Sequence, residues 1–224
     1  MRNHNIEGII FDMDGCLYPF DRGSGNTFGD SQFGQSIKAQ ELFFIQDQLG
    51  VDAETAKTIN RDLKARYNHH LSLALEYEHD IPRELFFNAT WDLQPAHFID
   101  KQPRLSSALS ELPVPSGLLT AAPKVWATRV LEYLGVDSHF GTRILCGDQD
   151  VRKPDPRAFQ QVADMLEIKP NRLISIGDQE RTDILPAQTL GMLTVRIGGN
   201  DTNADFLASD IPDAINQLKK EGLL

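Results

Sequence analysis

The segment IIFDMDGCLYP, residues 9–19, decides the fold of this chain. A short apolar run leads into two aspartates, Asp12 and Asp14, and then into a glycine. This pattern is typical of a buried strand with carboxylates at its C-terminal end, where ligands of open α/β sheets bind. Because both carboxylates lie on one side of an extended chain, a cation between them would relieve their repulsion. A surface turn would contain the same residue types, so the rest of the sequence has to decide.

The overall composition indicates a globular protein with a sizeable core. The chain has 224 residues, 41% of them hydrophobic, and no apolar stretch of about 18 residues that could span a membrane. A net charge of −10 argues against a nucleic acid polymer or an anionic membrane as a partner. The N-terminal sequence lacks the long apolar segment of a secretion signal, so we expect a cytoplasmic protein. The oligomeric state is not predicted.

Strand and helix patterns alternate from Pro103 to the C-terminus, which predicts a parallel sheet covered by helices on both sides. The expected strands are 118–120, 143–146, 173–176 and 192–197, and the expected helices are 124–134, 155–167, 182–190 and 211–220. A first strand at 7–12 is too short to stand alone and should join the same sheet.

The segment between the first and second strands contains no convincing strand. Residues 21–35 are rich in Gly, Ser, Asn and Asp, which predicts a loop. Helices are expected at 36–49, at 53–77 with a break near Tyr67 and Asn68, and at 83–91. His69 and His70 would then be adjacent on a helix. We therefore predict an α/β domain of residues 1–18 and 101–224, with a helical domain of residues 19–100 inserted into it.

Four of the predicted strands lead into residues that suit phosphate chemistry. The first leads into the two aspartates, the second into Thr120, the third into Lys153 of RKPDP, and the fourth into Asp178, with Asp183 five residues later. Each feature alone is weak; KPDP, for example, is most often a helix start with Asp155 as the N-cap. Together, at the carboxyl ends of strands in one sheet, they predict a single site.

In this order, FDMDGC, LLT, RKPDP and GDQERTD resemble the four motifs of the haloacid dehalogenase superfamily of phosphatases, over nearly the whole chain. The resemblance implies a Rossmann-like parallel sheet core with an inserted helical cap. FDMDGCLYPF, TAAPKVWATRVLEYLGV and IGDQERTDILPA are most similar to pyrimidine 5'-nucleotidase-type hydrolases. Cys16 stands where Thr or Val is usual, and Ala121 stands where Asn is common in nucleotidase-like members.

The resemblance also implies a role for each site residue. Mg²⁺ would be held by the side chains of Asp12 and Asp178 and by the backbone carbonyl of Asp14. Asp12 would attack phosphorus and form an aspartyl-phosphate, while Asp14 would act as the general acid and base.

Four further positions would bind phosphate or support the site. Thr120 and Lys153 would hold the phosphoryl oxygens, and backbone N–H groups after Asp12 and Thr120, including that of Ala121, would complete the phosphate cradle. Asp183 would support the metal site by orienting water or Lys153.

These residues predict a Mg²⁺-dependent phosphomonoester hydrolase acting on a small phosphorylated metabolite. By the resemblance, a nucleoside 5'-monophosphate is the first candidate substrate, and sugar phosphates or phosphoglycolate follow it. The cap would set the substrate. A dehalogenase is an alternative that needs no metal, but Asp14 argues against it because that chemistry has no alkoxide to protonate. A catalytically silent binding protein is a second alternative. Such a protein would lack the nucleophile, a metal ligand or the lysine, and this sequence has all of them.

Overall fold

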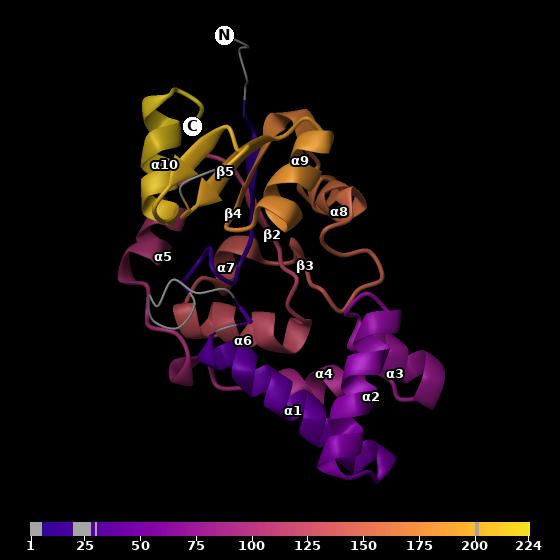
Figure 1. Cartoon of the computed structure of the whole chain (residues 1–224). Coiled ribbons are helices and arrows are strands. Elements are labelled where there is room, and N and C mark those ends of the chain that lie inside the picture. The colour runs from indigo at the N-terminus through magenta and orange to yellow at the C-terminus, as the bar shows by residue number, and fades with distance from the viewer. Residues whose placement is uncertain (1–5, 20–27, 30, 200–201) are drawn as a thin grey trace. The chain divides into compact units, whose positions relative to one another are not determined.

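The structure is a computed structural model that describes residues 6–19, 28–29, 31–199 and 202–224. The chain divides into two compact units (Figure 1). The α/β unit comprises Met1–Pro19 and Ile99–Leu224, and the helical unit comprises Phe20–Phe98. Within the described ranges, no helix is long and apolar enough to cross a membrane.

A parallel sheet forms the centre of the α/β unit. In the described part of the chain it has six strands in the order β3-β2-β1-β4-β5-β6. Their bounds are β1 Gly8–Phe11, β2 Ser116–Leu119, β3 Ile144–Leu145, β4 Leu173–Gly177, β5 Leu193–Ile197 and β6 Phe206–Ala208. The predicted fold class is confirmed. The short edge strand β6 was not predicted, because three residues give too little periodicity.

Helices cover both faces of this sheet, so its central strands β1, β2 and β4 are buried along their whole length. Ile10 of β1 pairs with Gly117 on one side and Ser175 on the other. Figure 1 shows α8 and α9 on one side of the sheet, and α5 and α10 on the other. The helices are α5 Pro103–Ser110, α6 Lys124–Leu134, α7 Asp137–Phe140, α8 Pro156–Leu166, α9 Leu185–Thr189 and α10 Ile211–Lys220.

The ends of the predicted helices are partly confirmed. Asp155 is the N-cap of α8, and its side chain accepts a hydrogen bond from the backbone N–H of Arg157 at 2.9 Å. The helix predicted at 182–190 is wrong at its start, because the chain forms a π-helical turn at Glu180–Ile184 before α9. Pro186 lacks an N–H group, so an α-helical ladder would lose a bond there. The short helices α5 and α7 were not predicted.

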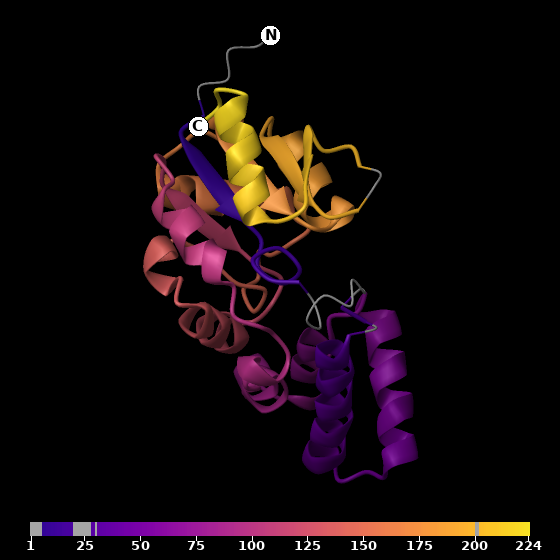
Figure 2. The same ribbon diagram turned by 90° about the vertical axis from the view of Figure 1, so that its left-hand side faces the viewer.

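The helical unit has its own apolar core. It contains α1 Gln32–Leu49, α2 Ala53–Arg66, α3 Leu71–His79, α4 Arg83–Trp91 and a 3₁₀ turn at Pro95–His97. Figure 2 shows α1 and α2 lying side by side. Buried residues from all four helices meet in the core: Phe44, Ile45, Ala56, Leu63, Leu71, Ala74, Leu75 and Phe86.

The predicted start of α1 at Ser36 is wrong. The helix begins at Gln32, where the hydroxyl of Ser31 accepts a hydrogen bond from the N–H of Gly34 at 2.9 Å. A Cβ atom at position 34 would lie 1.8 Å from the carbonyl oxygen of Phe28, so this helical position needs glycine. Most of the predicted loop, residues 20–27 and 30, lies outside the described residues.

The predicted break in the second helix is confirmed. Helix α2 ends at Arg66 and α3 begins at Leu71. His69 has a φ of 68° and lies between the two helices, as His70 does, so the expectation that both histidines lie on a helix is wrong.

Candidate active site

The order of the strands defines where a ligand site should form. From β1 the chain leads to β2 on one side, and from β4 it leads to β5 on the other side. The connections therefore diverge between these two neighbouring strands, and ligands of open α/β sheets bind at such a point, beyond the carboxyl ends of the strands. Asp12 directly follows β1, and Asp178 directly follows β4.

A buried lysine joins two of the predicted site carboxylates. The Nζ atom of Lys153 lies 2.6 Å from Oδ1 of Asp12 and 2.6 Å from Oδ1 of Asp183. The three side chains are 3%, 9% and 2% exposed, respectively, so these charges are almost completely removed from water. Buried charges of this kind are stable only when they are paired and hydrogen-bonded. The structure thus brings Lys153 to Asp12 from 141 residues away.

The π-helical turn after β4 brings Asp183 to the end of that strand. A Cβ atom at Gly177 would lie 2.5 Å from Cγ of Asp183, so only glycine leaves room for this carboxylate. Oδ2 of Asp183 accepts a hydrogen bond from the backbone N–H of Gln179 at 2.8 Å. Both oxygens of Asp183 therefore already have partners, one with Lys153 and one with the backbone.

Asp178 has the features expected of a ligand for a hard cation. Its Oδ1 atom is buried, yet it accepts no hydrogen bond from the described residues. Oxygens of Asp12, Asp178 and Asp183 all lie within 4.8 Å of one another. Carboxylate oxygens are the donors that Mg²⁺ prefers, and a buried acceptor without a donor is costly unless a cation satisfies it. The residues present therefore fit Mg²⁺, with Asp12 and Asp178 as the carboxylates that would hold it.

The protonation behaviour of these groups follows from burial and mutual repulsion. Burial raises the pKa of Asp12, and burial together with the charge of Asp183 raises the pKa of Asp178 to about 7. Burial alone would lower the pKa of Lys153, but Asp12 and Asp183 outweigh it and raise that pKa. The raised pKa keeps the lysine charged at neutral pH, whereas a metal ion at Asp178 has to compete with a proton for the same carboxylate.

Asp14 lies in a different environment from Asp12. Its Oδ1 atom accepts a hydrogen bond from the indole N–H of Trp126 at 2.9 Å and another from the hydroxyl of Tyr18. Its Oδ2 atom accepts one from the hydroxyl of Thr120 at 3.4 Å. Burial raises the pKa of Asp14. Its carboxylate is not part of the group of three aspartates that could hold a metal, and a role for its backbone carbonyl stays a prediction.

Thr120 and Ala121 lie at the end of β2, as predicted. The hydroxyl of Thr120 accepts a hydrogen bond from the backbone N–H of Ala122 at 3.0 Å, and it is 1% exposed. Ala121 is exposed in the turn that follows. Thr120 therefore contacts Asp14 directly, a link that the sequence did not suggest.

The two cysteines, Cys16 and Cys146, are buried free thiols. The Sγ atom of Cys16 donates to the carbonyl oxygen of Ile176 at 3.5 Å, and burial raises its pKa. Burial also raises the pKa of Cys146 to about 12. Neither thiol is activated.

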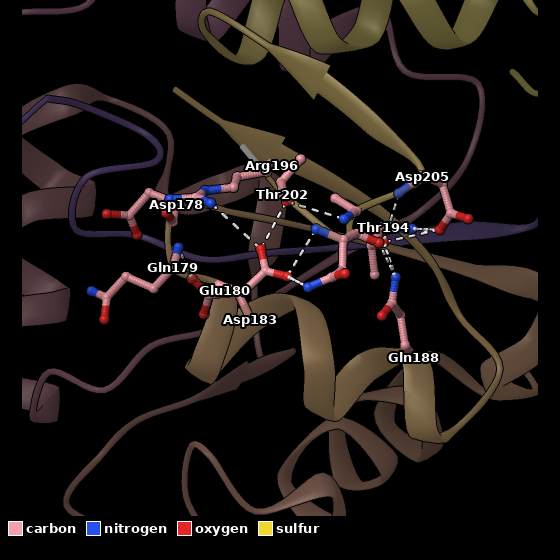
Figure 3. Close-up of polar contacts among 11 residues, drawn as sticks. Asp178, Gln179, Glu180, Asp183, Gln188, Thr194, Arg196, Thr202 and Asp205 are labelled. Atoms are coloured by element: carbon pink, nitrogen blue, oxygen red, sulfur yellow. Dashed lines mark hydrogen bonds and ion pairs between the residues drawn. The ribbon is translucent and has the colours of Figure 1, made fainter. Parts of the chain in front are cut away.

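A polar network fixes the turn that carries Asp178 (Figure 3). The carboxylate of Glu180 accepts hydrogen bonds from the hydroxyl of Thr202 at 2.7 Å, and from the backbone and side-chain nitrogens of Asn203 at 2.9 and 2.8 Å. Arg196 donates to the backbone carbonyl of Asp178 at 3.3 Å and lies 3.5 Å from Glu180. The network thereby ties the loop after β5 to the Asp178 turn.

Sequence reasoning gave no role to Tyr18, Trp126, Glu180 or Arg196. The first three lie inside the motif segments FDMDGCLYPF, TAAPKVWATRVLEYLGV and GDQERTD. Position within a motif was therefore the available signal, but hydrogen-bond partners far apart in sequence cannot be read from one chain.

Curated relatives of the chain are phosphatases. A glyceraldehyde 3-phosphate phosphatase of Methanopyrus kandleri is 24% identical over 201 residues, which cover 86% of this chain and 84% of the relative. A phosphoglycolate phosphatase of Escherichia coli is 29% identical over 227 residues, which cover 95% and 89%. These relatives support the predicted enzyme class, a phosphatase-type hydrolase, but neither is a pyrimidine nucleotidase.

Solved structures with a similar fold include a phosphatase and a dehalogenase. A HAD phosphatase from Thermococcus onnurineus has a TM-score of 0.65 and 19% identity, covering 95% of this chain and 98% of that one. A 2-haloacid dehalogenase from Pseudomonas syringae has a TM-score of 0.64 and 19% identity, covering 96% and 99%. The family model of the haloacid dehalogenase-like hydrolases matches residues 6–191. The chain belongs to the haloacid dehalogenase-like hydrolase family.

Proposed function

We propose that this protein is a Mg²⁺-dependent phosphomonoester hydrolase that uses Asp12 as its nucleophile. One observation carries the proposal: the buried Asp12 is paired with Lys153 and lies beside Asp178, whose buried Oδ1 atom has no hydrogen-bond donor among the described residues. A carboxylate can approach a phosphate dianion only if cations offset the repulsion. Lys153 supplies one cation, and the orphaned oxygen indicates the place of a second.

The two carboxylates of the first motif have different roles in this proposal. Bound Mg²⁺ would polarise the phosphoryl group and offset its charge. An oxygen of Asp12 attacks phosphorus as the bond to the leaving oxygen breaks, and Asp14 donates a proton to that oxygen. The products of this step are the alcohol and an aspartyl-phosphate. Water then attacks the phosphorus, Asp14 takes its proton, and phosphate leaves Asp12.

The remaining site residues bind the phosphoryl group or support those that do. Lys153 and the hydroxyl of Thr120 hold phosphoryl oxygens, and the backbone N–H of Ala121 adds a donor. Asp183 positions Lys153 through the contact at 2.6 Å. A lysine that is charged at neutral pH suits this role, and the pKa of Lys153 is held above its usual value by Asp12 and Asp183.

The test of the proposal is Asp12→Asn with an aryl phosphate as substrate. We expect turnover to fall by a factor on the order of 10³ or more, because the nucleophile is lost. EDTA should abolish wild-type turnover and Mg²⁺ should restore it. Asp210→Asn is the matched control, since this half-buried residue is the N-cap of α10 and asparagine caps helices equally well. Full activity of Asp12→Asn, or activity indifferent to EDTA, would contradict the proposal.

The substrate class in this proposal is a small phosphorylated metabolite. The similarity of three segments to pyrimidine 5'-nucleotidase-type enzymes favours nucleoside 5'-monophosphates. The name of one curated relative supports phosphoglycolate, which the sequence already offered as a candidate, and the name of the other adds glyceraldehyde 3-phosphate. A panel of these compounds, with released phosphate as the readout, would rank them by kcat/KM. Release of halide from a haloacid without added metal would instead support a dehalogenase.

A further inference from the structure

The carboxylate of Asp14 is held by two buried side chains that the proposed chemistry does not use. Oδ1 of Asp14 accepts hydrogen bonds from the indole nitrogen of Trp126 at 2.9 Å and from the hydroxyl of Tyr18. The two aromatic residues are 0% and 2% exposed. Oδ2 faces the hydroxyl of Thr120 at 3.4 Å. The two oxygens of one carboxylate therefore have different surroundings.

We propose that Trp126 and Tyr18 are positioning residues that orient Asp14 for proton transfer, an inference that rests on the proposed phosphatase function. An indole N–H can only donate a hydrogen bond, so the oxygen facing it has to remain an acceptor. A proton on Oδ1 would point at this donor, whereas a proton on Oδ2 would face the hydroxyl of Thr120, which can rotate and accept it. The geometry thus assigns the transferable proton to Oδ2, on the side of Thr120.

The backbone holds both donors firmly. Asp14 and Tyr18 form a β-bridge within the turn after β1, and Trp126 lies in the first turn of α6, immediately after the Thr120 turn. Side chains on such rigid, buried elements hold a catalytic group more precisely than side chains on exposed loops do. Loss of either donor should keep the carboxyl group of Asp14 in the site but allow the plane of that group to rotate.

The proposal predicts a dependence on the leaving group. Aryl phosphates with acidic phenols need little proton donation, whereas alkyl phosphates need a full proton on the departing oxygen. For Tyr18→Phe and Trp126→Phe, we expect kcat/KM to stay within about threefold of wild type for p-nitrophenyl phosphate and to fall about tenfold or more for an alkyl phosphate. A plot of log kcat/KM against the leaving-group pKa should therefore become steeper.

Two comparisons separate positioning from a general structural effect. Tyr133→Phe removes a hydroxyl from the other end of α6, where it bonds the carbonyl of Ile99, and should leave the slope unchanged. Asp14→Asn should steepen the slope by itself, and adding Trp126→Phe to it should produce no further change, because both act through one proton transfer. Tyr18→Phe, which removes a single oxygen, keeps the test valid if the tryptophan variant does not fold.

The outcomes distinguish this inference from the proposed function. Equal losses of kcat/KM for aryl and alkyl phosphates in both aromatic variants would show that these side chains have only a structural role. A steeper slope in Trp126→Phe that persists in the Asp14→Asn background would also contradict the inference. If Asp12→Asn retained activity, the proposed function itself would fail, whatever the aromatic variants do.

Discussion

At the scale of single residues, Asp178 shows how burial couples protons to the metal. Its pKa is raised from its usual value near 3.8 to about 7, chiefly by burial. The folded state then binds this proton more tightly than the unfolded state does, so stability falls as pH rises from about 4 to about 7. A carboxylate that destabilises the metal-free fold at neutral pH is consistent with a position reserved for a cation.

Asp178→Asn should therefore stabilise the metal-free protein above about pH 7, because the neutral amide carries no buried charge. We expect its Tm to exceed that of wild type by several degrees at about pH 8, and the difference to shrink at about pH 5. Mg²⁺ should raise the Tm of wild type but not of the variant. Calorimetry across this pH range, with EDTA or Mg²⁺, measures each quantity.

Asp210→Asn is the control for this experiment, since it removes a half-buried carboxylate that pairs with Arg104 and is not one of the proposed metal ligands. An unchanged response to Mg²⁺ in Asp178→Asn would remove this residue from the metal site. A lower Tm at about pH 8 would show that its carboxylate stabilises the metal-free fold, contrary to the sign derived from its pKa.

At the scale of elements, the sequence predicts those whose pattern is long and regular. Strand β1 and helix α8 were found because an apolar run or a capped periodic helix identifies each of them. The start of α1 was missed because Gly34 is a poor helix residue that is needed only for its contact with the carbonyl of Phe28. The π-helical turn at Glu180–Ile184 was missed for a related reason, since its shape depends on the close approach of Asp183 to Gly177.

The candidate site also divides into residues that the sequence predicted and contacts that it did not. Asp12, Lys153, Asp178 and Asp183 were predicted together because each follows a strand, and the carboxyl ends of parallel strands meet at one edge of the sheet. The bonds of Asp14 to Tyr18 and Trp126 could not be predicted, because they depend on how a turn and a helix pack.

The loop after β5 should affect metal binding through Glu180. Hydrogen bonds from Thr202 and Asn203 outweigh the effect of burial and hold the pKa of Glu180 below its usual value. Glu180→Gln weakens these charge-assisted bonds, which should loosen the turn that carries Asp178. We expect the affinity for Mn²⁺, measured by titration calorimetry, to fall about tenfold, the lower end of the range for residues that support metal ligands.

Glu221→Gln is the control for this change, because Glu221 is an exposed residue at the end of α10. A lower Tm in Glu180→Gln with an unchanged Mn²⁺ affinity would mean that the network in Figure 3 stabilises the fold without positioning Asp178.

At the scale of the whole molecule, the two units have separate apolar cores. Phe44, Leu63 and Leu75 lie in the core of the helical unit, whereas Phe159 and Leu173 lie in that of the α/β unit. All the residues proposed to hold the metal lie in the α/β unit. Damage to the core of the helical unit should therefore reduce stability without changing the metal site.

Leu75→Ala tests this separation. Leu75 is 0% exposed in α3, and truncation of such a leucine costs about 2–5 kcal/mol of unfolding free energy. We expect a lower temperature for the first unfolding transition but an unchanged Mn²⁺ affinity at about 25 °C, where the α/β unit stays folded. Leu218→Ala, an equally buried leucine in α10, is the matched change in the α/β unit and should weaken Mn²⁺ binding as that unit loses stability. If Leu75→Ala weakened Mn²⁺ binding as strongly as Leu218→Ala does, the two units would have to unfold as one. Changes made in the helical unit to alter the substrate would then also affect the metal site.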